Sequence, residues 1–320
     1  MRGVILIGGG CWRSEAERVM GLGIPVMTTW QAADYVDNRH PNYFGRPGIW
    51  GMRHSNLILD RCELIENLGS RLSVWTVGYQ GDIAAKVGEG TIPDASWLAQ
   101  CTKWRKELRL IESPTHDDPP GGIHPYRLVK ALEASLTRDA IVVTDMGTAL
   151  TAAFQTLLVT PPQRLMTSGG LGEMGCGLPA AIGAAFSSPG KEVICLTCDG
   201  GMMLNLQELA TIAHHRLQIK IVVFENDGYA MIRQTQRAAG YSLEGVGSKD
   251  LSFPNFRMLA QSFGIRSCDV TTWAEYDRAL PEFFGNPEPA MMVYHFQPKI
   301  DLLPKLMAGN KGFADMSPAL

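Results

Sequence analysis

Short apolar runs rich in β-branched residues alternate with helical patterns along most of this 320-residue sequence. Because parallel strands need long crossovers that are usually helices, this alternation is typical of parallel sheets covered by helices. The sequence therefore predicts an α/β protein with two doubly wound parallel-sheet domains. The predicted strands cover residues 4–7, 24–28, 62–68, 140–144, 193–197, 219–224 and 290–296.

A polar stretch rich in proline and glycine, residues 111–124, separates the two predicted domains. It ends at His124, and Pro125 suits the first turn of a helix. We therefore expect a first domain over 1–110, a linker over 111–124 and a second domain over 125–320. One predicted strand, 62–68, contains Glu66 and Asn67, which do not suit a strand buried on both faces.

The composition excludes several classes of partner. The 29 basic and 32 acidic residues give a net charge of −3 without long runs of one sign, so we expect neither nucleic acid nor membrane as a partner. The apolar run Gly3–Ile7 is too short to cross a bilayer and no cleavage site follows it, which favours a cytosolic location. Seven scattered cysteines do not predict disulfides, and we interpret Cys195 and Cys198 as small buried strand residues rather than zinc ligands.

A glycine run, Gly8 to Gly10, follows the first predicted strand. A dinucleotide-binding turn would have another glycine at the position of Arg13 and an acidic residue after a second strand nearby. Neither is present, which favours a tight strand-to-helix turn that needs glycine backbone freedom. Nucleotide binding stays open as the alternative.

Polar side chains and glycines follow two later strands. Asp199, Gly200 and Gly201 come after the strand over 193–197, and Asn226 and Gly228 come after the strand over 219–224. The carboxyl ends of neighbouring parallel strands open on one crevice, where doubly wound folds bind ligands. Carboxylate and amide oxygens suit Mg²⁺ or Ca²⁺, and glycines let backbone N–H groups approach phosphates. By spacing alone, these residues could also be helix caps and turn residues.

The sequence around these turns closely resembles the signature of thiamine diphosphate (ThDP) enzymes. Residues 198–212 read Cys-Asp-Gly-Gly-Met-Met-Leu-Asn-Leu-Gln-Glu-Leu-Ala-Thr-Ile, and residues 221–229 read Ile-Val-Val-Phe-Glu-Asn-Asp-Gly-Tyr. Further segments resemble the acetolactate synthase-like branch of that family, so the resemblance covers nearly the whole chain. It implies a truncated Rossmann-like central domain followed by a ThDP diphosphate-binding domain. The further segments are 45–48, 51–53, 69–72, 144–148 and 167–181.

The resemblance implies a ThDP site anchored by Mg²⁺. The side chains of Asp199 and Asn226 and the carbonyl of Gly228 would bind the metal. The family has a bulky apolar residue at the position of Met174 to hold the cofactor bent, and Gly172 matches its glycine-rich pyrimidine-side loop. The residues expected around the diphosphate and the thiazolium are Gly147, Thr148, Gly200, Gly201, Tyr229, Ala230 and Met231.

Several positions depart from the family pattern. Cys198 and Glu225 replace the usual Gly and Asn, but neither position supplies a metal ligand in the family. Thr235 stands where acetolactate synthases proper have a tryptophan that selects the second keto acid, which argues against acetolactate synthesis itself. Residues 80–93 are short and contain glycine where members that hold FAD have a further strand, so FAD is not expected.

The family also has a pyrimidine-binding domain whose glutamate helps to activate the cofactor, whereas this sequence begins at what resembles the central domain. We therefore expect the glutamate to come from a separate polypeptide. The chain would be the ThDP-binding subunit of a split 2-oxo acid decarboxylase or carboligase, a lyase or transferase in a homo- or hetero-oligomer. A non-catalytic ThDP-binding or interaction protein, as a truncated or decayed member of the family, is the alternative, and a nicotinamide-dependent dehydrogenase is a third possibility.

Polar side chains near the predicted site have simpler interpretations than acid–base catalysis. We interpret Glu173 as a solvated loop residue, and His214 and His215 as surface residues that complement a helix dipole. Arg233 is considered as a group that faces a substrate carboxylate.

Overall fold

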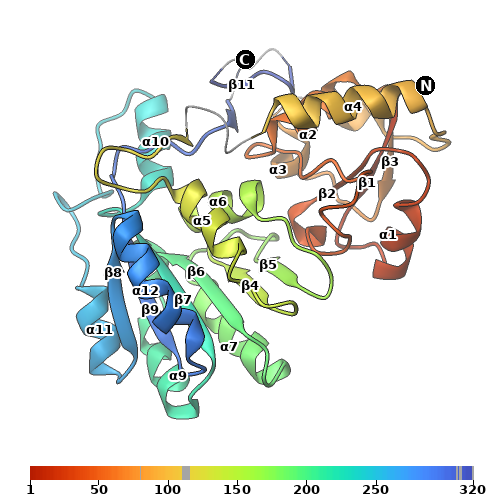
Figure 1. The fold of residues 1–320 in the computed structure, drawn as a ribbon. Coiled ribbons are helices and arrows are strands. Elements are labelled where there is room, and N and C mark those ends of the chain that lie inside the picture. The colour runs from red at the N-terminus through yellow and green to blue at the C-terminus, as the bar shows by residue number, and fades with distance from the viewer. Residues whose placement is uncertain (80, 110–115, 308, 310–311, 319–320) are drawn as a thin grey trace. The chain divides into compact units, whose positions relative to one another are not determined.

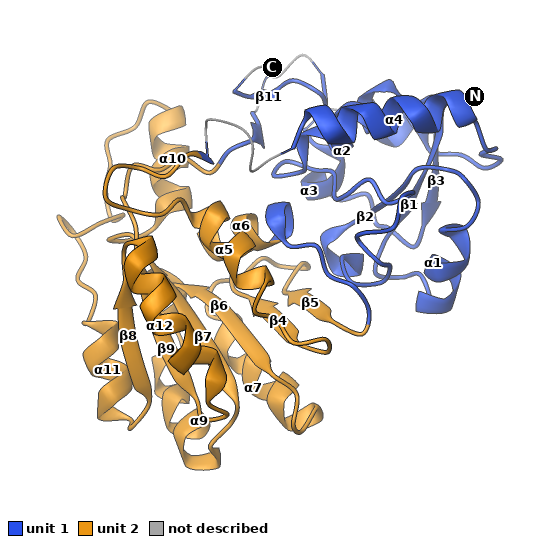
Figure 2. Ribbon diagram, in the orientation of Figure 1, with its two compact units in different colours: residues 1–116, 154–161, 303–320 blue, residues 117–153, 162–302 orange. Residues whose placement is uncertain are grey.

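The computed structural model describes residues 1–79, 81–109, 116–307, 309 and 312–318, which form two compact units (Figure 2). The first unit takes in residues 1–116, 154–161 and 303–320, and the second takes in residues 117–153 and 162–302. None of the helices within these described ranges is both long and apolar enough to cross a membrane.

The first unit is built on a three-stranded parallel sheet in the order β2-β1-β3 (Figure 1). In β1, Val4 and Leu6 pack into one hydrophobic cluster, and Ile5 and Ile7 pack into another. Because both faces of this central strand are buried, β1 is a continuous apolar run in the sequence. The elements are β1 (Gly3–Ile7), α1 (Arg13–Val19), β2 (Val26–Thr28), η1 (Trp30–Ala32), α2 (Arg53–Arg61), β3 (Leu64–Leu68), α3 (Val74–Val77), η2 (Ala84–Lys86) and α4 (Ala95–Glu107).

The edge position of β3 explains how it accommodates Glu66 and Asn67. The Glu66 carboxylate accepts the backbone N–H of Thr91 at 3.3 Å, and the Asn67 amide donates to the carbonyl of Ser70 at 2.9 Å. Beyond β3, the described residues 81–93 contain one isolated parallel bridge, from Val87 to Ile65, and no strand. The sheet therefore ends at β3, as the short segment after residue 79 predicts.

The second unit contains a six-stranded parallel sheet in the order β5-β4-β6-β7-β9-β8. Successive residues of a strand point to opposite faces of the sheet. In the central strands such neighbours, for example Ile221 and Val222, are all buried, so helices cover both faces. The predicted doubly wound fold is confirmed. The elements are α5 (Pro125–Glu133), β4 (Ile141–Thr144), α6 (Thr148–Thr156), β5 (Arg164–Thr167), α7 (Gly177–Ser187), β6 (Val193–Cys198), α8 (Asp199–Met202), η4 (Leu206–Glu208), α9 (Leu209–His215), β7 (Ile219–Glu225), α10 (Ala230–Ala238), α11 (Phe256–Ser262), β8 (Arg266–Val270), α12 (Trp273–Gly285) and β9 (Ala290–His295).

The compact units correct the predicted domain bounds of 1–110 and 125–320. Residues 154–161 join the first unit, where the buried Arg46 guanidinium donates to the carbonyl of Phe154 at 2.6 Å. Residues 303–318 also join it, through the two-stranded ribbon of β10 (Lys305–Leu306) and β11 (Met316–Ser317). The division between the units falls at 116/117, within the predicted linker 111–124, of which 111–115 lie outside the described residues.

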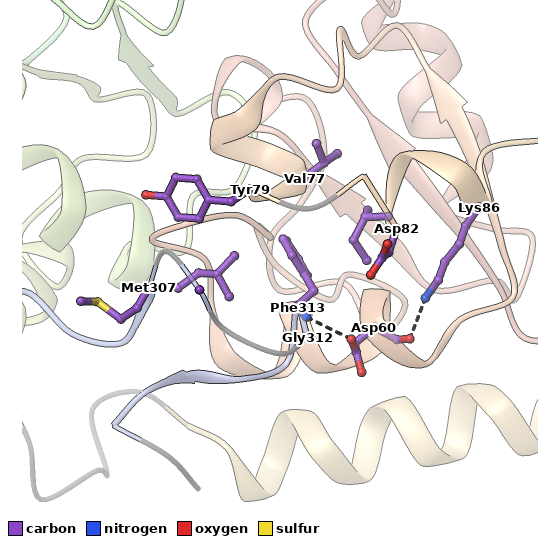
Figure 3. Close-up of a pocket in the computed structure, with 11 residues that line it drawn as sticks. Asp60, Val77, Tyr79, Asp82, Lys86, Met307, Gly312 and Phe313 are labelled. Carbon is purple, nitrogen blue, oxygen red and sulfur yellow. Dashed lines mark hydrogen bonds between the residues drawn. The ribbon is translucent and has the colours of Figure 1, made fainter.

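The C-terminal segment completes the hydrophobic core of the first unit. Leu306 and Phe313 belong to the same buried cluster as Val77, and the Phe313 N–H donates to the carboxylate of Asp60 at 3.1 Å (Figure 3). Gly78 permits this packing, because a Cβ there would lie 2.7 Å from the Leu306 side chain. The sequence has no periodic signal over 303–318 that could predict this contact.

Candidate functional site

The order of the six strands creates a switch point between β4 and β6. From β4 the chain crosses to β5 on one side, and from β6 it crosses to β7 on the other. Crevices at the carboxyl ends of such strands are where open α/β sheets bind ligands. Gly147 and Thr148 follow β4, and Asp199 follows β6, so the switch point brings these predicted site residues to one edge of the sheet.

Asp199 ties together the two predicted metal-binding turns. Its side chain is fully buried, and Oδ1 accepts the N–H of Gly200 at 2.7 Å. Oδ2 accepts the N–H groups of Asn226 at 3.0 Å and Gly228 at 2.9 Å. Burial raises the pKa of this carboxyl to about 6, and the three N–H groups oppose that rise. A carboxylate has about four lone-pair sites, so one remains for a metal ion.

Two buried oxygens beside Asp199 have no hydrogen-bond partner among the described residues. They are Oδ1 of Asn226, in a residue 2% exposed, and Oγ1 of Thr148, in a residue 1% exposed. A buried polar atom without a partner costs about 1–3 kcal/mol, and a ligand atom bound at these two oxygens would offset that cost. A carboxylate and an amide oxygen are hard ligands of the kind that Mg²⁺ prefers. The residues present therefore fit a magnesium-anchored anion.

The predicted metal ligands include a single carboxylate, that of Asp199. No group of three or more His, Cys, Asp or Glu residues in the described part of the chain could hold a metal. A site built on Asp199 and Asn226 consequently depends on oxygen atoms from elsewhere. The carbonyl of Gly228 and phosphate oxygens of a ligand are the predicted sources. The role of that carbonyl stays a prediction.

Close backbone approaches explain the glycines of this site. A Cβ at Gly200 would lie 2.1 Å from the ring of Tyr229, and one at Gly201 would lie 2.4 Å from the Asp145 carboxylate. Gly228 has φ +127°, and a Cβ there would lie 2.2 Å from the carbonyl of Val246. These positions exclude side chains, and the N–H groups of Gly200 and Gly228 already donate to Asp199, so the glycines keep the two turns closely packed around this carboxylate.

The turn after β4 packs against Cys198. Gly147 has φ +100°, and a Cβ there would lie 3.1 Å from the Cys198 sulfur, which accepts the N–H of Ala149 at 3.5 Å. Burial raises the pKa of the Cys198 thiol. Cys195 is buried in the middle of β6, so the interpretation of both cysteines as buried strand residues is confirmed.

Gly172 and Met174 lie on the exposed loop between β5 and α7. Gly172 has φ +71°, and Met174 is 36% exposed. The Glu173 carboxylate accepts the hydroxyl of Ser168 at 2.6 Å on the surface of this loop, as expected for a solvated residue. Met231 lies in the first turn of α10, which Ala230 begins. The roles of these residues towards a cofactor stay predictions.

Arg233 is a structural residue, and the interpretation that it faces a substrate carboxylate is wrong. The side chain is buried, and its guanidinium donates to the carbonyls of Asp227 and Val246, both at 3.0 Å, and of Pro298 at 2.6 Å. These bonds hold the turn that carries Asn226 and Gly228. One turn of helix, α8, begins at Asp199 itself.

The contacts that join Asp145, Thr197 and Gly175 were not predicted from the sequence. Asp145 at the end of β4 is buried, and its carboxylate accepts the hydroxyl of Thr197 at 3.0 Å and the N–H of Gly175 at 2.9 Å. Asp145 lies within the segment 144–148 that resembles the family. An aspartate directly after a predicted buried strand, at the same edge of the sheet as Asp199, is the signal that could have identified it.

The fold and the site together define a doubly wound α/β protein with a buried carboxylate, Asp199, and a buried amide side chain, Asn226, after two neighbouring central strands. Two family models match the chain: the thiamine pyrophosphate enzyme central domain over residues 1–89, and the thiamine pyrophosphate enzyme C-terminal TPP binding domain over residues 145–294. The chain belongs to the thiamine pyrophosphate (ThDP) enzyme family.

Named relatives point to one branch of this family. The chain is 29% identical over 329 residues to the acetolactate synthase isozyme 1 large subunit of Escherichia coli (strain K12), covering 91% of this chain and 58% of the relative. It is 29% identical over 336 residues to the acetolactate synthase large subunit of Cyanidium caldarium, covering 90% of this chain and 56% of the relative. The chain thus spans somewhat over half the length of these relatives.

Proposed function

We propose that the second unit binds ThDP through Mg²⁺ held by Asp199, Asn226 and the carbonyl of Gly228. The observation that carries this proposal is the buried, unpartnered Oδ1 of Asn226 beside a carboxylate with one lone-pair site to spare. Bound ThDP supplies an electron sink for carbon–carbon bond chemistry at a carbonyl.

The residues of this chain would hold and orient the cofactor rather than transfer protons. The backbone of Gly200 and Gly201 would border the diphosphate, and Thr148 offers a buried hydroxyl that has no partner among the described residues. The buried surroundings of Asp199 weaken competition from water, which strengthens each polar contact. Met174 and Met231 would contact the organic part of the cofactor.

We further propose that the reaction is decarboxylation or carboligation of a 2-oxo acid, and that a pyrimidine-domain polypeptide supplies the activating glutamate. The names of the relatives support the substrate class. The matches to the central and C-terminal domains support the role of this chain as the diphosphate-side subunit. Thr235 argues for a second substrate other than that of acetolactate synthesis. A cytosolic location and self-association complete the proposal, and sedimentation velocity tests the latter.

The first experiment is a titration of the purified chain with ThDP, with and without Mg²⁺, alone and mixed with a pyrimidine-domain chain. We expect Mg²⁺-dependent binding that Asp199→Asn weakens by about 10- to 100-fold. Asp277→Asn, which changes an exposed aspartate of α12, is the matched control and should bind normally. Failure of the wild-type chain to bind ThDP under every condition would refute the proposal.

The second experiment follows the consumption of pyruvate and longer 2-oxo acids by the same mixtures. Turnover only in the presence of the pyrimidine-domain chain supports the split arrangement. Turnover by this chain alone would contradict it. Binding of ThDP without turnover in any mixture would favour the alternative of a non-catalytic ThDP-binding protein.

A further inference from the structure

Asp145 is a buried carboxylate at the switch point, 1% exposed, at the end of β4. Its Oδ1 accepts the N–H of Met146 at 2.8 Å and the N–H of Gly175 at 2.9 Å. Its Oδ2 accepts the hydroxyl of Thr197 at 3.0 Å. One carboxylate therefore joins the turn after β4, the loop before α7 and the end of β6.

The peptide at Gly175 is held from both sides. Asp145 accepts its N–H, and its carbonyl accepts the side-chain amide of Asn205 at 2.7 Å. Gly175 has φ +85°, and a Cβ there would lie 2.7 Å from the Cβ of Leu204. This residue follows Met174 directly, so the loop that carries Met174 is fixed at its base while its tip, Leu171, is 90% exposed.

The Asp145 carboxylate also contacts the Asp199–Gly201 turn, which the proposed function places next to the diphosphate. A Cβ at Gly201 would lie 2.4 Å from Oδ2 of Asp145, which means that the backbone of the Asp199–Gly201 turn packs directly on it. Thr197, two residues before Asp199, donates to the same oxygen. The Asp145 carboxylate therefore contacts both the loop and the turn directly. Hydrogen bonds to a charged acceptor are stronger than neutral ones, which suits a fixed spacing.

We infer that Asp145 is a positioning residue of the proposed ThDP site: through Gly175 it holds the loop of Gly172 and Met174 at a set distance from the Asp199–Gly201 turn. This inference rests on the proposed function. A ligand with two ends binds best when the groups for both ends are already in place, because no ordering cost remains at the moment of binding.

The test variant is Asp145→Asn, which keeps the shape of the side chain and removes its charge. Its amide NH₂ group would also face N–H and O–H groups that now donate to the carboxylate. Asp277→Asn makes the same chemical change at an exposed aspartate of α12 and is the matched control. The measurements are the ThDP dissociation constant at saturating Mg²⁺, the near-ultraviolet circular dichroism of bound ThDP, and the rate of cleavage after Glu173 by a glutamyl endopeptidase.

For Asp145→Asn we expect ThDP binding at least about 10-fold weaker, an altered dichroism band and about 10-fold faster cleavage after Glu173, all below the unfolding temperature. Asp277→Asn should stay within about threefold of the wild type. A purely structural role would lower the unfolding temperature but leave the folded variant with wild-type affinity and cleavage, and that result would overturn the inference.

The same measurements also cover two further cases: an Asp145→Asn variant that does not fold, and a wild-type chain that binds no ThDP. If Asp145→Asn does not fold, Asn205→Ala frees the other side of the Gly175 peptide and must show the same changes; wild-type behaviour of that variant overturns the inference. If the wild-type chain binds no ThDP, the proposed function fails, whereas the cleavage assay still reports separately whether Asp145 holds the loop.

Discussion

The carboxylate of Asp199 accepts the backbone N–H of Asn226 at 3.0 Å, so the turns after β6 and β7 are joined within the protein itself. This bond aligns the backbone of Asn226 and leaves its side-chain Oδ1 buried and without a partner. The protein thus accepts an energetic cost at the position where the proposed metal would bind. Such conflicts between stability and local chemistry are expected at functional sites.

The variant Asn226→Ala tests whether the buried Asn226 side chain serves ligand binding at a cost in stability. Truncation removes the unpartnered oxygen, whose burial costs about 1–3 kcal/mol, so we expect the apo chain to lose no thermal stability. The affinity for Mg²⁺–ThDP should fall by about 10-fold or more. Differential scanning fluorimetry and a ThDP titration measure the two effects. A strongly destabilised variant with unchanged affinity would show that the side chain is structural.

Gly201→Ala tests the close packing of the turn against Asp145. The new Cβ would lie 2.4 Å from the carboxylate, and we expect a loss of about 1–3 kcal/mol in the free energy of unfolding, together with weaker ThDP binding. The control is Gly183→Ala in α7, where nothing lies within 4 Å of the added carbon. It should stabilise the helix by about 0.5–1 kcal/mol. Urea unfolding measures both, and equal effects would contradict the packing argument.

His295 predicts a pH dependence of stability. Its Nδ1 contacts the Glu225 carboxylate and its Nε2 lies 2.9 Å from Asp269, and these two acids raise the pKa of the imidazole to about 9. The charged form is favoured in the folded state, so its stabilisation is fully present below the unfolded pKa of about 6.5. That stabilisation is lost as the pH rises through about 9.

The measurement is the free energy of unfolding between pH 6 and pH 10. The wild-type chain should lose stability over the upper part of this range, and His295→Gln should lose less of it. The effect should also shrink at high salt, because the side chain of His295 is 38% exposed. Parallel curves for the two proteins would show that another group is responsible.

Phe313→Ala tests the C-terminal closure of the first unit. Phe313 is 7% exposed within the core cluster, and its truncation should cost about 3–5 kcal/mol. Phe186→Ala, at a residue 51% exposed, should change stability by no more than about 0.5 kcal/mol. Tryptophan fluorescence reports the transition, because every tryptophan except Trp273 belongs to the first unit. An unchanged fluorescence transition would mean that the segment is not part of the core.

The central strands of the six-stranded sheet could be predicted from the sequence, whereas its edge strands could not. In β6 and β7 both faces are buried, which forces continuous apolar runs such as Ile219–Phe224. The strands β5 and β8 lie at the two edges of the sheet and are mostly half-buried, so Arg164–Thr167 and Arg266–Val270 carry mixed residues without an apolar signal.

The candidate site was also predicted only in part from the sequence. Asp199 and Asn226 follow strands that the sequence reveals, so their meeting at one edge of the sheet follows from parallel topology. The contacts of Asp145 with Gly175 and Thr197 span 30 and 52 residues of sequence, and no local pattern records them. The place of residues 303–318 was missed for the same reason, because Leu306 and Phe313 depend on a core formed by distant strands.

That placement of residues 303–318 has a consequence for how the protein forms during translation. Residues 1–116 leave the ribosome before the second unit, yet the core of the first unit lacks Leu306 and Phe313 until residue 313 has been made. The second unit, continuous except for residues 154–161, emerges complete before then. Domains normally fold in the order of synthesis. Here the later-made unit can fold first, and the nascent chain must keep the earlier-made sheet soluble until its last core residues arrive.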